Sequence, residues 1–218
     1  MIGDAPRIEP LPLSELTPDL AAILKQMIEL DETLDSREHE LLTPFESLGE
    51  GQMPSGDAVT AALATMPEII ATMLRHPDLF SRQTAVGIQL LGRGALPPRI
   101  RELAILRIAW LCQAPYEWGE HVLVARDIGI TRDAVERVTQ GPDAPGWTPL
   151  EAAVLRAADE LYDDAMISDA TWAVLAEHFD DRQLIELPML IGQYQGVAYY
   201  QNSLRLRLHN GNEGLKAR

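Results

Sequence analysis

The chain has 218 residues, 46% of them hydrophobic, and it carries 33 acidic against 18 basic side chains, a formal net charge of −15. Length and composition predict one globular domain with an appendage. The acidic balance argues against binding to nucleic acid or to an anionic membrane, because both need a basic surface. A single cysteine excludes an intramolecular disulfide and any Cys-x-x-Cys motif. The opening residues lack a basic and apolar leader, so we expect a cytoplasmic protein.

The first quarter of the chain holds most of the excess negative charge. Residues 1–57 contain 13 acidic and 3 basic side chains, whereas residues 58–218 contain 20 and 15. We therefore expect two parts: an acidic N-terminal arm and linker over 1–56, and a helical domain over 57–218.

Within the arm, Thr17-Pro18 predicts the start of an amphipathic helix, because threonine caps helices and proline fits their first position. Residues 31–40 form a charged stretch. Residues 43–56 gather glycine, proline and serine and are typical of a linker.

From residue 57 onward the pattern is helical, and no segment shows the strict alternation of a strand. Proline, glycine and capping residues divide it into helices expected at 59–74, 79–91, 99–112, 115–128, 131–138, 149–162, 168–179 and 180–208. Thr148 with Glu151 fits a capping box, and Asp180 with Gln183 opens the last helix in the same way. The predicted fold class is all-α.

One region, residues 99–126, combines apolar burial with ionisable groups. Glu117 and His121 stand four residues apart and so share a helix face. A carboxylate beside an imidazole raises the pKa of the imidazole and fixes its tautomer, which makes a proton donor or acceptor near neutral pH. A second carboxylate on a neighbouring helix, such as Glu102, could hold the other ring nitrogen. The alternative is an ordinary solvated pair on a helix surface.

The sequence from residue 96 to 121 resembles the carboxymuconolactone decarboxylase family, whose superfamily also contains the alkylhydroperoxidase D-like (AhpD-like) proteins. The matching elements are Arg101-Glu102-Leu103, the apolar helix that follows, Tyr116-Glu117-Trp118 and Gly119-Glu120-His121. The resemblance implies an AhpD-like helical bundle, here preceded by a helical arm. It also implies a homo-oligomer, a trimer or hexamer.

The two redox cysteines of the peroxidase branch fall on Ala114 and Glu117 of this sequence, so the resemblance disfavours thiol peroxidase chemistry. Cys112 lacks a partner and is expected to pack in the core. What remains resembles the decarboxylase-like members of the family.

This resemblance implies a cofactor-independent lyase of the decarboxylase type that acts on a small carboxylated or lactone-like substrate. His121 is the expected proton donor, oriented by Glu117 or Glu102, and either glutamate could donate instead if it is buried and protonated. For substrate binding we name Arg99, Arg101, Trp118 and Tyr116, with Arg107 as a further candidate. Salt bridges and core packing are the ordinary alternatives for these side chains.

Two other readings stay open. The first is another Glu/His enzyme on the same scaffold, such as a hydrolase, dehydratase, isomerase or cyclase, and the second is a non-enzymatic oligomeric binder of small molecules. We expect no metal, no organic cofactor, no nucleic acid and no membrane partner. Tyr194, Tyr199 and Tyr200 on the last helix could line a pocket or a subunit interface, and the sequence does not decide between them.

Overall fold

The computed structural model describes residues 5–30, 66–209 and 211–218, and every regular element within these ranges is helical. The described part contains nine α-helices: α1 (Pro18–Leu30), α4 (Glu68–Met73), α5 (Pro77–Gly92), α6 (Pro98–Leu111), α7 (Pro115–Asp127), α8 (Arg132–Gln140), α9 (Pro149–Asp164), α10 (Asp169–Ala176) and α11 (Asp181–Leu204). Two short 3-10 helices, η1 (Leu13–Glu15) and η2 (Gly214–Lys216), complete these elements. The all-α prediction is confirmed. No helix in these ranges is long and apolar enough to cross a membrane.

The helices expected between residues 79 and 179 are all present, with ends that shift by three residues at most. The last helix ends at Leu204 rather than 208, because Arg205 adopts the left-handed conformation, with φ of 58°, that ends helices. Of the helix expected at 59–74, only the final part is described, as α4. The charged stretch 31–40 and the linker 43–56 lie outside the described residues.

The chain divides into two compact units, one formed by Met1–Pro6 with Ala95–Arg218 and the other by Arg7–Gly94. The boundary predicted between residues 56 and 57 falls outside the described residues and stays a prediction.

In the unit formed by residues 7–94, α1 packs against α5. Leu16, Leu24, Leu74 and Phe80 form its buried core. The backbone N–H of Leu11 donates to the carbonyl of Ala71 over 2.9 Å, which fixes the extended segment before α1 beside α4.

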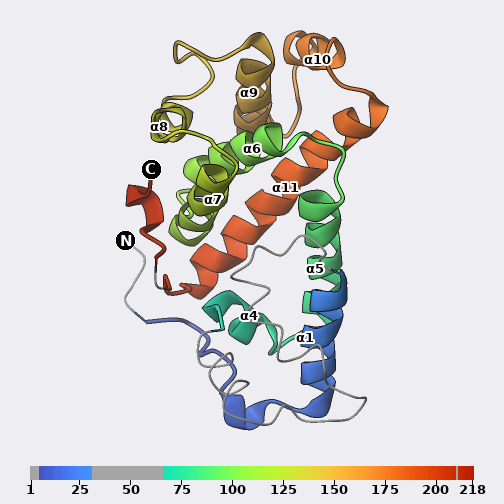
Figure 1. Cartoon of the computed structure of the whole chain (residues 1–218), viewed down its shortest axis with the longest axis vertical. Coiled ribbons are helices and arrows are strands. Elements are labelled where there is room, and N and C mark those ends of the chain that lie inside the picture. Colours follow the sequence, from blue (N-terminus) through green and yellow to red (C-terminus); the bar gives the residue numbers. More distant parts are fainter. Residues whose placement is uncertain (1–4, 31–65, 210) are drawn as a thin grey trace. The chain divides into compact units, whose positions relative to one another are not determined.

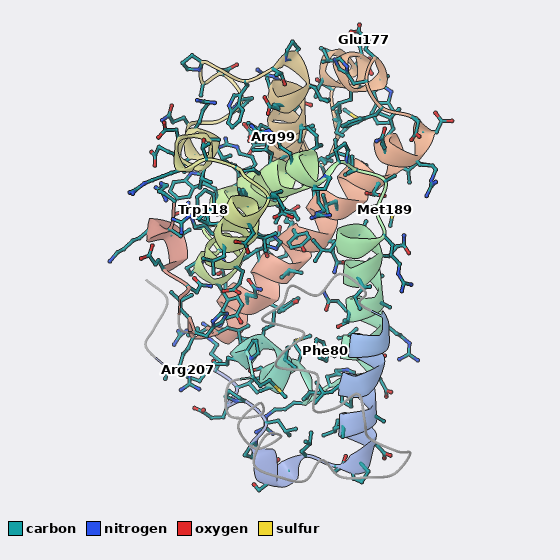
Figure 2. The ribbon with its side chains drawn as sticks, viewed as in Figure 1. Phe80, Arg99, Trp118, Glu177, Met189 and Arg207 are labelled. Atoms are coloured by element: carbon teal, nitrogen blue, oxygen red, sulfur yellow. The ribbon has the colours of Figure 1, made fainter. Side chains whose placement is uncertain are left out.

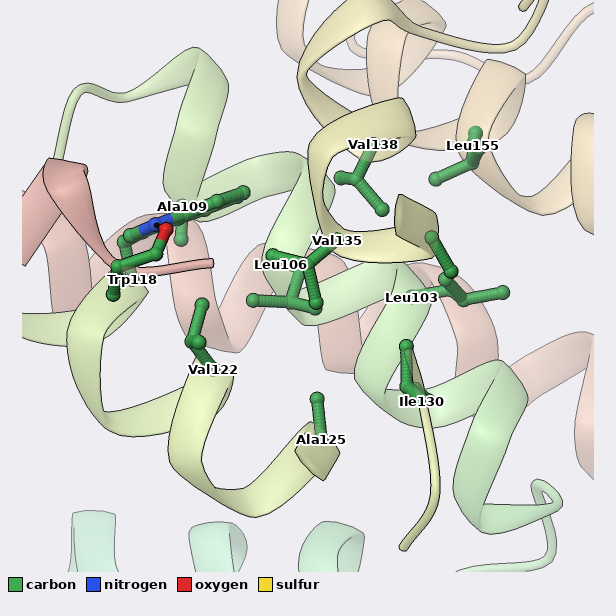
Figure 3. Packing of buried hydrophobic residues seen from close by; sticks show 12 residues of the cluster. Leu103, Leu106, Ala109, Trp118, Val122, Ala125, Ile130, Val135, Val138 and Leu155 are labelled. Carbon is green, nitrogen blue, oxygen red and sulfur yellow. Dashed lines mark hydrogen bonds between the residues drawn. The ribbon is translucent and has the colours of Figure 1, made fainter. Parts of the chain in front are cut away.

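The larger unit is built around α6, which packs against α7, α8, α9 and α11 (Figure 1). Helix α6 is buried along most of its length, with apolar side chains from Leu103 to Ile108 interrupted by the buried Arg107, as expected for a helix with several packed neighbours. Its Leu103 and Leu106 are fully buried, and each such burial stabilises the fold by roughly 1.5–3 kcal/mol. Figure 3 shows the cluster that they form with residues of α7, α8 and α9.

Local sequence signals fix where the helices of this unit begin. Pro98, Pro115 and Pro149 each occupy the first turn of a helix, where the missing N–H costs nothing. Thr148 and Asp180 form complete capping boxes at the starts of α9 and α11. These signals set the first turns of the helices, and α6 and α7 among them carry the ionisable residues.

The C-terminal segment of the chain is fastened to α7. The side-chain amide of Asn212 donates to the Tyr116 carbonyl over 2.9 Å and also to Glu120. The Trp118 indole N–H donates to the Ala217 carbonyl over 3.0 Å. Gly119 lies directly under the Asn212 side chain, so close that a Cβ at this position would overlap it.

We therefore expect Gly119→Ala to destabilise the fold by about 1–3 kcal/mol, because overpacking forces the Asn212 anchor off α7. The matched control is Gly192→Ala on α11, where no atom lies within 4 Å of the added Cβ. That change removes a helical glycine and should be neutral or stabilise by roughly 0.5–1 kcal/mol. Urea denaturation of both variants measures the difference. Equal stabilities would contradict the packing argument.

Candidate active site

A buried hydrogen bond joins α6 to α7 through two of the predicted site residues. Nδ1 of His121 lies 2.7 Å from Oε2 of Glu102. Glu102 is fully buried, whereas the His121 side chain keeps 11% of its surface exposed. Nε2 of His121 makes no hydrogen bond within the described part of the chain. A carboxylate on Nδ1 favours the tautomer with its proton on that atom and leaves Nε2 as the nitrogen for chemistry.

The Glu102 carboxylate also accepts a hydrogen bond from Arg101, whose Nε lies 3.0 Å from Oε1. Burial acts to raise the pKa of Glu102, but the charge and hydrogen bond of His121, together with those of Arg101, outweigh burial and lower the pKa. Glu102 is therefore ionised at neutral pH. It can hold a proton-carrying imidazole in place and stabilise its charge.

Glu117 occupies a different environment, although it stands one turn before His121 on α7. Its side chain is buried, and neither carboxyl oxygen has a hydrogen-bond partner among the described residues. Burial raises the pKa of Glu117 well above its ordinary value, so the group is a neutral carboxylic acid at neutral pH. The sequence left open which glutamate orients His121, and the structure assigns this hydrogen bond to Glu102.

Tyr194 of α11 completes the cluster, and the sequence did not place it there. Its ring meets the His121 ring edge-on, with the centroids 4.8 Å apart and the planes at 87°. Burial, and the nearby charges of Glu102 and Glu117, raise the pKa of Tyr194 well above its ordinary value, so the phenol keeps its proton. A signal was available: Leu187, Leu190, Ile191, Tyr194, Val197, Ala198 and Gln201 share the buried face of α11 at helical spacing.

The arginines named for substrate binding lie in different surroundings. Arg101 belongs to the Glu102 cluster, and its side chain is 16% exposed. Arg99 donates from Nε to Glu151 over 2.8 Å and is 44% exposed. Arg107 forms two hydrogen bonds with Asp159, at 2.5 and 3.0 Å, between α6 and α9. Of these three arginines, the structure brings Arg101 into contact with the Glu102 and His121 pair.

The two aromatic residues named for substrate binding, Trp118 and Tyr116, also lie in different surroundings. Trp118, labelled in Figure 2, lies on α7. It is fully buried in the core cluster, and its ring centroid lies 5.0 Å from that of Trp110. Tyr116 is buried two positions earlier on α7, and its ring lies edge-on to that of His209. Both residues belong to α7, the helix that also carries Glu117 and His121. A direct contact of either with substrate stays a prediction.

Cys112 follows α6 and is half-buried. Burial and the nearby charge of Glu117 raise the pKa of its thiol to about 11, so almost none of it is the reactive thiolate at neutral pH. The positions of the two peroxidase cysteines hold Ala114 and Glu117. Within the described residues no group of three His, Cys, Asp or Glu side chains is arranged to hold a metal ion.

Comparison with known proteins agrees with this architecture. Residues 77–160 match the sequence model of the carboxymuconolactone decarboxylase family. No curated protein matches the chain in sequence.

Several solved structures share the fold. The debrominase Bmp8 in complex with 2,3,4-tribromopyrrole is similar over 96% of this chain and 95% of its own, with a TM-score of 0.65 at 16% identity. An uncharacterized peroxidase-related protein from Silicibacter sp. TM1040 covers 74% and 90%, with a TM-score of 0.62 at 15% identity. The alkylhydroperoxidase AhpD core protein from Ralstonia eutropha JMP134 covers 70% and 82%, with a TM-score of 0.60 at 19% identity. These likenesses establish the AhpD-like helical fold.

Proposed function

Because the chain belongs to the carboxymuconolactone decarboxylase family through residues 77–160, we propose that it is a cofactor-independent lyase of the decarboxylase type. The substrate is a small carboxylated or lactone-like molecule, and the reaction depends on proton transfer by a Glu/His pair. One observation carries the proposal: the buried hydrogen bond of 2.7 Å between Glu102 and His121. This hydrogen bond occupies Nδ1 of His121, so Nε2 is the imidazole nitrogen that remains for the substrate.

The reaction balances with protons alone. Cleavage of the C–CO₂⁻ bond releases CO₂ and leaves the bonding electron pair on the substrate carbon. A conjugated lactone carbonyl accepts this pair as a dienolate, and a proton delivered to carbon restores the neutral product. His121 supplies that proton from Nε2, and Glu102 stabilises the imidazolium form that carries it. Water then returns the proton to the imidazole.

Arg101 provides the positive charge of the site. Its guanidinium binds the Glu102 carboxylate, and in this proposal it also attracts the carboxylate of the substrate. Arg99 pairs with Glu151, whereas Arg101 pairs with Glu102 of the Glu102 and His121 pair itself, which makes Arg101 the better candidate of the two. Glu117 can donate a proton or a hydrogen bond but supplies no charge, because burial raises its pKa and keeps the carboxyl group neutral.

The test is an assay of CO₂ release from a panel of carboxylactones in D₂O. The wild-type protein should release CO₂ and place one deuterium on the product carbon. His121→Ala should lower kcat by about 10²–10³-fold, within the range typical of general acid–base residues. His178→Ala is the matched control, since His178 is an exposed histidine after α10.

Full turnover by His121→Ala would remove the imidazole from the mechanism. A wild-type protein that releases no CO₂ from any carboxylactone but converts other substrates would support another Glu/His enzyme. Binding of such molecules with no conversion would support the non-enzymatic binder.

A further inference from the structure

The hydrogen bond between Glu102 and His121 explains one half of the cluster and leaves the Glu117 carboxyl group and the Tyr194 hydroxyl without an assigned role. Both carboxyl oxygens of Glu117 lack a partner among the described residues, although the side chain is only about 1% exposed. The Tyr194 hydroxyl makes no hydrogen bond within the same part of the chain. An unpaired buried polar group such as the Glu117 carboxyl costs roughly 1–3 kcal/mol. Groups retained at that cost are expected to have their partner in a bound ligand.

Glu117 and Tyr194 belong to α7, the helix that carries His121, and to α11, which packs against α7. Glu117 lies one turn before His121 on α7, and residues four apart share a helix face. Tyr194 contacts the His121 ring from α11, and α11 packs directly against α7. Glu117, when it is ionised, raises the pKa of the Tyr194 phenol, so the two groups lie within electrostatic range of each other.

The cluster of Arg101, Glu102, Glu117 and Tyr194 carries no net negative charge, so it can accept one negative charge from a ligand. Glu102 is negative and is paired with the positive Arg101. Glu117 and Tyr194 are both neutral, because burial raises the pKa of each. A site without net negative charge and with two neutral O–H donors is suited to an oxygen atom that becomes negative during the reaction.

We propose that Glu117 and Tyr194 together bind the oxyanion that develops on the substrate, beside the proton donor His121. This inference rests on the proposed function and adds the substrate class to it: molecules in which an enolate or phenolate oxygen forms next to the carbon that gains or loses a proton. Glu117 donates from its carboxylic acid and Tyr194 from its phenol. A carboxylic acid kept neutral by an apolar site is a known form of oxyanion donor in proton-transfer enzymes.

The test uses 4-nitrophenol as the probe, because its phenolate mimics the oxyanion and absorbs visible light. The wild-type protein should bind the phenolate form, and the absorbance of the complex should show this at a pH where the free probe is largely protonated. Tyr194→Phe keeps the ring against His121 and removes only the hydroxyl, and Glu117→Gln keeps the size of the side chain. Each should weaken phenolate binding by about 10–100-fold, as expected for a lost hydrogen bond to a charged group.

Tyr199→Phe and Glu177→Gln are the matched controls, since both residues are exposed and lie outside the cluster. Both controls should bind the probe as the wild type does. Thermal unfolding monitored by circular dichroism checks whether Tyr194→Phe and Glu117→Gln are folded. A wild type that does not bind the phenolate, or variants that bind it unchanged, would overturn the inference.

The two proposals fail in different ways. If no carboxylactone is decarboxylated but phenolate binding still depends on Glu117 and Tyr194, the proposed reaction is wrong and the oxyanion site stands. If turnover depends on His121 while phenolate binding ignores Glu117 and Tyr194, the reaction stands and the oxyanion site is wrong.

Discussion

Glu102→Gln is expected to lower kcat by about 10³-fold while the protein stays folded, because it removes the charge that orients and supports His121. The amide side chain has nearly the same shape as the carboxylate. It cannot offer two acceptor oxygens, however, so it cannot satisfy His121 and Arg101 together. The imidazole then loses the carboxylate that fixes its tautomer and stabilises its protonated form. Steady-state kinetics on the substrate found in the CO₂ assay measures the loss.

The same variant should lower the free energy of unfolding by about 1.5–3 kcal/mol at neutral pH, the contribution of hydrogen bonds to a charged group. The pKa of Glu102 is lowered in the folded protein from an ordinary value of 4.5. Its contribution is therefore complete above that pH and is lost as the pH falls through the folded pKa. The stability difference between wild type and Glu102→Gln should shrink accordingly on the acid side.

Glu177→Gln, at the exposed end of α10, serves as the control for a general loss of negative charge. It should change neither kcat nor the pH dependence of stability. A Glu102→Gln protein with normal turnover would show that His121 works without its carboxylate.

Much of the fold is predictable from the sequence because its signals are local. A capping box such as that at Thr148 needs only four consecutive residues, and a proline such as Pro98 marks a first turn by its own geometry. The end of α11 is different. Arg205 takes the left-handed conformation that ends the helix, and only a glycine or asparagine at this position would have predicted that end from the sequence. The N–H of Leu206, which is buried, donates to the Gln201 carbonyl at this helix end, and no local residue pattern marks that end, so the sequence predicted a longer helix.

The candidate site shows the same division between local and tertiary information. Helical spacing is enough to place Glu117 and His121 on one face of α7. The choice of Glu102 as the partner of His121 depends on how α6 packs against α7. Tyr194 comes from α11, about 70 residues farther along the chain, and no short motif links it to His121. The sequence could therefore name Glu102, Glu117 and His121 as candidates but not the contribution of α11 to the site.

Glu117→Leu is expected to make the protein more stable and catalytically impaired. Leucine removes a buried carboxyl group that has no hydrogen-bond partner among the described residues, a group whose burial costs roughly 1–3 kcal/mol. It also removes the neutral donor that the proposed oxyanion site needs. A gain in stability with a loss of function is expected where a polar group is retained for chemistry rather than for folding. Urea denaturation and the CO₂ assay measure the two effects separately.

The pH dependence separates this explanation from simple repacking. The pKa of Glu117 is raised by burial from an ordinary value of 4.5, so between that pH and the raised value the folded protein holds a proton that the unfolded chain has released. The wild type should therefore lose stability as the pH rises from about 4.5, by up to about 1.4 kcal/mol per pH unit. Glu117→Leu and Glu117→Gln both lack this slope, so the free energy of unfolding of each variant relative to the wild type rises with pH. The opposite result is a leucine variant that is less stable at every pH and whose free energy of unfolding changes with pH as that of the wild type does. This result would mean that Glu117 is ionised and paired in the fold. The proposed oxyanion site would then lack its neutral acid.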